Sequence, residues 1–167
     1  MFYEERFKEW SRINYNDLIL DDYILFGHGS YRSKRFRDSE CIDKRISAVE
    51  HYAVKFCKHF KIRREKFAFA YNDEIGSSKV RELASGHNHL VISSYQPIEL
   101  NAQEAAQWSN KFWKDNYGIC QFEPFNKHKK KNAIGYLCKA TQNNLLVMND
   151  FRTSKAMKRR INYLKNN

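Results

Sequence analysis

Residues 86–92 read Gly-His-Asn-His-Leu-Val-Ile, and this stretch predicts a core strand of a β-sheet because it ends on three large aliphatic residues. Side chains alternate along a strand, so His87 and His89 project from one face and Asn88 from the other. Two imidazoles on one face can hold a divalent metal when a carboxylate joins them and positions stay open for water and phosphate. The motif alone is also consistent with two surface histidines that bind nothing.

A carboxylate for such a site comes before the histidine strand. Residues 67–71 (FAFAY) alternate large and small side chains and predict a neighbouring strand. We expect Glu74, just after it, to be the third metal ligand, with Asp73 as the alternate and Glu82 as a further possibility. The stretch 72–86 is polar and is interpreted as a turn or hairpin loop. The alternative for each of these acids is a solvated turn residue that binds no metal.

The wider pattern alternates strands with amphipathic helices. It predicts strands at 23–31 and 119–125, and helices at 43–61, at 101–117 with Asn101 as its cap, and at about 132–141. Residues 1–22 carry only a weak helical pattern.

This order of elements predicts an α+β fold with a ferredoxin-like split β-α-β arrangement. Its antiparallel sheet would carry helices on one face, leave the other face free for a ligand, and be followed by an added C-terminal catalytic helix. We expect a single domain over residues 1–167, with its core at about 23–141 and a charged tail at about 149–167.

The charge of the chain favours a polyanionic partner. There are 30 Lys and Arg residues against 19 Asp and Glu, a formal net charge of +11, and nucleic acid is the commonest partner of so basic a protein. An anionic membrane is the weaker alternative, and no apolar run is long enough to span one. The N-terminus lacks the apolar stretch of a secretion signal, and the four cysteines are scattered, so we expect free thiols and a cytoplasmic protein.

Two basic segments are candidate DNA-binding surfaces, although the one after the first predicted strand is equally consistent with a solvated loop. One follows the first predicted strand and the other precedes residue 132. Their candidate residues are Arg32, Lys34, Arg35, Lys127, Lys129, Lys130 and Lys131.

Residues 132–141 (NAIGYLCKAT) place Tyr136 and Lys139 three apart, on one face of the predicted helix. A tyrosine hydroxyl is a weak nucleophile at neutral pH and needs nearby positive charge or a polarised phosphate. Lys139 would supply that charge. On its own, such a pair is more often a core tyrosine beside a solvated lysine.

Together these motifs resemble the HUH endonuclease superfamily, and within it the single-tyrosine rolling-circle replication initiators (Rep proteins) of phages, viruses and plasmids. The resemblance covers roughly residues 23–141. The second motif of that family matches GHNHLVI, with Asn88 where the family usually has a bulky apolar residue. The third motif matches Tyr136-Leu137-Cys138-Lys139.

The resemblance implies a metal-dependent endonuclease that nicks and joins single-stranded DNA at a replication origin. His87, His89 and an acid would hold Mg²⁺ or Mn²⁺, and Tyr136 would form a covalent 5′-phosphotyrosine with Lys139 as its electrostatic helper. The chain has no G-x-x-x-x-G-K-[ST] loop, so any helicase would be a separate partner from the host or the element. The resemblance leaves open whether the protein is a monomer or a dimer.

Three other classes of protein share part of this pattern. A single-tyrosine HUH transposase also uses H-x-H and one tyrosine, but Lys139 favours the initiator. A relaxase is less expected, because relaxases are usually larger and carry a third histidine. A DNA- or RNA-binding module without catalysis is the remaining alternative.

Overall fold

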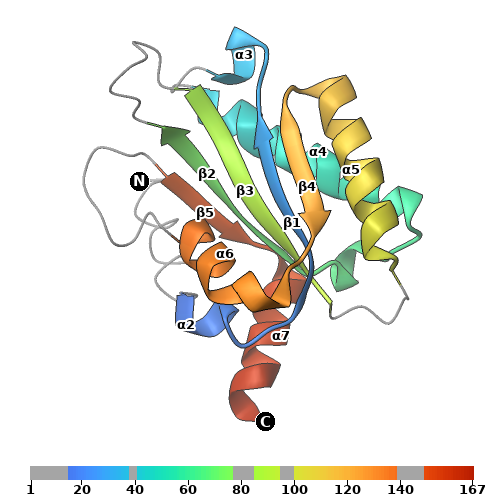
Figure 1. The fold of residues 1–167 in the computed structure, drawn as a ribbon, viewed down its shortest axis with the longest axis vertical. Helices are drawn as coiled ribbons and strands as arrows, with labels where there is room; N and C mark the ends of the chain where they lie inside the picture. Colours follow the sequence, from blue (N-terminus) through green and yellow to red (C-terminus); the bar gives the residue numbers. More distant parts are fainter. Residues whose placement is uncertain (1–14, 38–40, 77–84, 95–99, 139–148) are drawn as a thin grey trace.

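The computed structural model describes residues 15–37, 41–76, 85–94, 100–138 and 149–167. Its strands are β1 (Tyr23–Ser30), β2 (Phe69–Gly76), β3 (Ser85–Ser93), β4 (Cys120–Pro124) and β5 (Asn149–Thr153). They form a five-stranded sheet in the order β4-β1-β3-β2-β5, and every neighbouring pair is antiparallel (Figure 1). The predicted α+β class with an antiparallel sheet is confirmed.

One face of the sheet is covered by α4 (Ile42–His59) and α5 (Ala102–Asn116). The apolar stripe of α4 is buried against the sheet, as its helical spacing predicts. At the start of α5 the side chain of Asn101 accepts hydrogen bonds from the backbone amides of Gln103 and Glu104, at 2.9 and 3.1 Å. The predicted cap of this helix is therefore confirmed.

Two glycines of β1 leave room for aromatic rings on this face of the sheet, one ring from α5 and one from β4. A Cβ atom on Gly29 would lie 2.6 Å from the ring of Trp113, and one on Gly27 would lie 2.4 Å from the ring of Phe122. Neither position has room for a side chain. Because residues alternate along the strand, His28 between them points to the opposite face.

The opposite face also carries helices, which differs from the prediction of a free face. The short helix α2 (Tyr15–Leu18), α6 (Lys130–Leu137) and α7 (Lys155–Asn166) lie on it, and α6 lies in front of the sheet in Figure 1. They form a second core with Ala70 of β2 and Val91 of β3. Among the described segments, none forms a helix long and apolar enough to cross a membrane.

Residues 149–167, expected as a charged tail, are instead part of the fold. β5 pairs with β2 along its length, and α7 buries Ala156, Met157 and Ile161. The side chain of Ser154 caps α7 by accepting from the amide of Met157 at 3.1 Å. The many basic residues of α7 conceal its narrow apolar stripe in the sequence.

β2 also runs further than expected. Asn72, Asp73 and Glu74, assigned to a turn by their polarity, continue the strand to Gly76. Asn and Asp are poor strand formers, but here β3 pairs on one side and β5 on the other. The extension brings residues 72–74 into register with the histidine strand.

Candidate metal centre

The strand registers align two rows of polar side chains across the face that carries α6. In one row His89 of β3 lies opposite His28 of β1 and Asn72 of β2. In the next row His87 lies opposite Glu74 of β2. Directly opposed residues of antiparallel strands share a face, with Cβ atoms about 4.5–5.5 Å apart. The register therefore gathers imidazole, carboxylate and amide groups within a small area.

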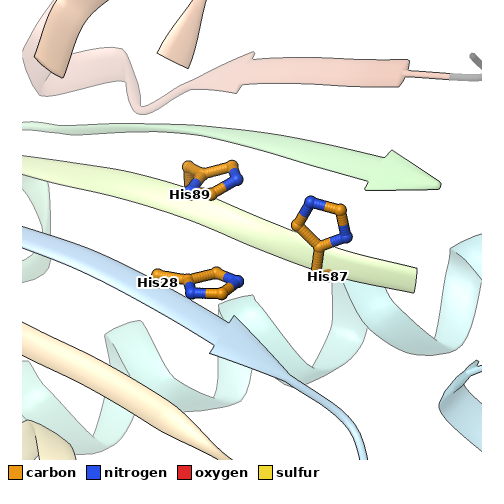
Figure 2. A group of neighbouring side chains, drawn as sticks. All are labelled: His28, His87 and His89. Carbon is orange, nitrogen blue, oxygen red and sulfur yellow. The ribbon is translucent and has the colours of Figure 1, made fainter. Parts of the chain in front are cut away.

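Three imidazoles form the centre of this area (Figure 2). One nitrogen from each of His28, His87 and His89 lies within 4.8 Å of the others. The rings of His28 and His89 stack at 4.8 Å, while His87 meets them edge-on at 5.5 and 5.2 Å. Such a spacing suits ligands that share one metal ion.

Glu74 supplies a carboxylate beside two of these rings. Its Oε2 atom lies 3.5 Å from Nε2 of His87 and 3.6 Å from Nε2 of His89. Two ligand atoms at roughly 2.1 Å from a tetrahedral ion are about 3.4 Å apart. The side chain is 11% exposed. The spacing of these donors therefore fits a divalent cation, and Nε2 of both histidines faces the carboxylate.

The charge state of His28 also suits binding of a metal ion. Burial lowers its pKa below that of an ordinary histidine, and nearby His87 lowers it further, while Glu74 acts in the opposite direction. His28 is therefore neutral at pH 7, which is the form of imidazole that binds metals.

Asp73, the alternate ligand, points to the opposite face of the sheet. Nε of Arg45 on α4 donates to both of its carboxylate oxygens, at 3.0 and 2.9 Å, and both side chains are almost fully buried. Asp73 therefore joins α4 to β2 and is not beside the histidines. Glu82 lies outside the described residues.

Tyr136, the predicted nucleophile, lies at the edge of the histidine cluster. Its ring meets that of His89 edge-on, with centroids 4.6 Å apart, and 46% of the residue is exposed. Ile134 and Leu137 are buried in the core on this face and hold α6 against the sheet. Lys139, its predicted helper, lies outside the described residues.

The basic residues proposed to bind DNA come from two places. Arg32, Lys34 and Arg35 follow β1 and are exposed; residues 34–37 form the short helix α3 (Lys34–Arg37) and not the expected loop. The second group lies in η3 (Lys127–Lys129) and at the start of α6. Their side chains are exposed except that of Lys130.

Lys130 is half-buried, and its Nζ lies 3.5 Å from Oδ1 of Asp22. This contact ties the start of α6 to the segment before β1. Of the second basic group, Lys127, Lys129 and Lys131 are therefore better placed to meet an anion.

His28 and Asn72 lie in the site although the sequence did not predict them there. Alternation alone puts His28 on the face of β1 away from the glycines, but only the register with β3 shows which residue it meets. The third imidazole also removes one of the two reasons for preferring an initiator to a relaxase.

No protein-family model, curated protein or solved structure matches this chain.

Proposed function

We propose that the protein is a divalent-metal-dependent endonuclease that nicks and joins single-stranded DNA through a covalent bond to Tyr136, and that it initiates rolling-circle replication. One observation carries the proposal. An exposed tyrosine lies against His89, in a cluster of three imidazoles and one carboxylate that fits a metal. A nucleophile at the edge of a metal centre is the arrangement that phosphate transfer requires.

The four candidate ligands are His28, His87, His89 and Glu74, and Mg²⁺ or Mn²⁺ is the proposed cofactor. A bound divalent cation would neutralise negative charge on the oxygens of the scissile phosphate. The chain itself holds the nucleophile: α6 is anchored by its buried residues, which fixes Tyr136 beside His89.

In the proposed reaction the hydroxyl oxygen of Tyr136 attacks the phosphorus, and the bond from phosphorus to the 3′ oxygen breaks. The phenolic proton goes to solvent water, and the departing 3′ oxygen takes up a proton. The products are a free 3′-hydroxyl, which can prime replication, and a 5′-phosphate bound to Tyr136. Attack by another 3′-hydroxyl reverses the step and joins the strand.

The two basic groups support DNA as the substrate. One follows β1 a few residues after His28, and the other directly precedes Tyr136 along the chain. Single-stranded DNA bound at the histidine cluster would find exposed cations in the segments that adjoin His28 and Tyr136 along the chain, and these cations can contact its phosphates.

The order of elements supports the finer description of the fold. β4-β1-β3-β2 with α4 between β1 and β2, and α5 between β3 and β4, is the arrangement expected of a ferredoxin-like split β-α-β unit. β5 and α7 are additions to that unit.

The proposal is tested with labelled single-stranded oligonucleotides tiled across the replicon that encodes the protein. Each is incubated with Mn²⁺ or with EDTA and run on denaturing protein gels. We expect a metal-dependent protein band shifted by covalent DNA. Tyr136→Phe and His87→Ala should each abolish it, whereas Tyr163→Phe, at an exposed tyrosine of α7, should leave it unchanged.

Tight binding without an adduct on any oligonucleotide would contradict the proposal and favour a binding module without catalysis. An adduct that survives in Tyr136→Phe would show that another residue is the nucleophile.

A further inference from the structure

Asn72 is a buried polar residue of the histidine face. It is fully shielded from solvent, and among the residues that the structure describes neither its amide oxygen nor its amide nitrogen has a hydrogen-bond partner. Buried amides are almost always hydrogen-bonded, and leaving one unpaired costs free energy of folding. A residue that carries this cost invites a functional explanation.

The position of Asn72 suggests which group it serves. In the β2–β3 register Asn72 lies opposite His89, and Glu74 lies two residues further along the same face of β2. His89 therefore lies between His28 on one side and Asn72 on the other. A cross-strand neighbour at this spacing is within reach of an imidazole.

His89 needs such a neighbour when it binds a metal. Its Nε2 faces Glu74, so its Nδ1 must carry the proton when Nε2 is the ligand. Both ring nitrogens are shielded from solvent, so water is poorly placed to accept that proton. Metal-binding histidines usually donate their second N–H to a carboxylate or carbonyl oxygen, which fixes the tautomer and the orientation of the ring.

We infer that Asn72 is a positioning residue of the metal centre, whose amide oxygen accepts the Nδ1 proton of His89 when the metal is bound. The inference rests on the proposed metal centre and adds to it a residue outside the four ligands. It predicts that Asn72 raises the affinity for the metal, an effect that burial of the side chain alone would not produce.

Metal affinity without DNA is the first measurement. Titration calorimetry with Mn²⁺ should show affinity about 10–100-fold lower in Asn72→Leu than in the unchanged protein, as expected for loss of an outer partner of a ligand. Asn72→Asp keeps an acceptor oxygen and should retain affinity within about threefold. Thermal unfolding of the metal-free proteins should show Asn72→Leu at least as stable as the unchanged protein, because an apolar residue of similar shape replaces an unpaired amide.

Asn88 offers a matched control, because it is equally buried but lies on the opposite face of β3. Its Nδ2 donates to the hydroxyl of Tyr31 at 2.9 Å. Asn88→Leu should lower the unfolding temperature and leave Mn²⁺ affinity unchanged. Comparing the two leucine variants then separates two effects: the loss of any buried amide, and the loss of the hydrogen bond that supports His89.

A spectroscopic readout tests the unchanged protein, so the inference does not depend on any variant folding. Long-range ¹H–¹⁵N spectra of the Zn²⁺-loaded protein should show His89 bound through Nε2 with a slowly exchanging proton on Nδ1. Coordination through Nδ1 would overturn the inference, as would equal Mn²⁺ affinity in Asn72→Leu or a loss of affinity in Asn72→Asp as large as that in Asn72→Leu.

Failure of the metal centre itself gives a different result. If the unchanged protein binds neither Mn²⁺ nor Zn²⁺, both the proposed function and this inference fall. If it binds metal and forms the Tyr136 adduct while Asn72→Leu matches it in affinity, only the inference falls.

Discussion

His28 changes the chemical character of the proposed metal centre. Two imidazoles and one carboxylate suit a hard cation such as Mg²⁺ or Mn²⁺, but a third imidazole moves the preference towards borderline metals such as Co²⁺ and Zn²⁺. The ring stacks on His89, and burial keeps it neutral. The proposed site should therefore prefer Co²⁺ and Zn²⁺ to Mg²⁺. This preference should be stronger than that of a site with only the two imidazoles of the H-x-H motif.

His28→Gln tests this preference. Losing an imidazole ligand should weaken Co²⁺ binding by roughly tenfold or more, while Mg²⁺ binding changes less because Mg²⁺ gains little from nitrogen ligands. Calorimetric titrations with both metals measure the ratio. His51→Gln is a suitable control, since this exposed histidine lies on α4 and pairs with Tyr117. Unchanged Co²⁺ affinity in His28→Gln would exclude His28 as a ligand.

At the scale of single residues, the sequence allowed part of the site to be predicted. Alternation on a strand is a local rule, so the shared face of His87 and His89 follows from their spacing. Glu74 was proposed from its proximity in the chain. His28 could not be chosen because its place depends on the register between β1 and β3, which local sequence does not determine.

The helix α7 should contribute substantially to stability despite its basic composition. Met157 is fully buried in the core beside Ala70 and Val91. Met157→Ala should lower the free energy of unfolding by about 2–5 kcal/mol, the usual cost of removing a buried side chain of this size. Urea unfolding followed by circular dichroism measures this change.

Asn162→Ala, at an exposed position of the same helix, is the matched control and should change stability by less than about 0.7 kcal/mol. If Met157→Ala changed stability as little as Asn162→Ala, residues 155–166 would be a tail that does not pack against the core.

Helices with clear apolar stripes were predicted almost to their ends, as α4 and α5 show. β5 and the end of β2 were not predicted, because polar residues there are held by partners on neighbouring strands. Strand formation depends on such partners more than helix formation does. Elements stabilised by long-range pairing are therefore the ones that local patterns miss.

For the whole molecule, the net charge of +11 predicts DNA binding that weakens steeply with salt. For single strands, the logarithm of the affinity falls with the logarithm of salt concentration by about 0.7 for each phosphate contacted. Replacing Lys127, Lys129 and Lys131 with Gln should reduce that slope by about 2 if all three contact phosphates. Fluorescence anisotropy with a labelled oligonucleotide in EDTA measures the slope at several salt concentrations.

Lys111→Gln removes a cation that is already paired with Asp115 on α5 and should leave the slope unchanged. Equal slopes for the triple variant and the unchanged protein would place the DNA elsewhere on the surface.

The pairing of β5 with β2 has a consequence for the order in which the protein is made. The strand with Asn72 and Glu74 gains its second neighbour only when residues 149–153 are available, and ribosomes add about 5–20 residues per second. For several seconds of translation β2 is therefore an open sheet edge, able to pair with another nascent chain. The strand that carries Glu74 is enclosed on both sides only once synthesis has passed β5, so the proposed centre reaches its final form only after residues 149–153 have been made.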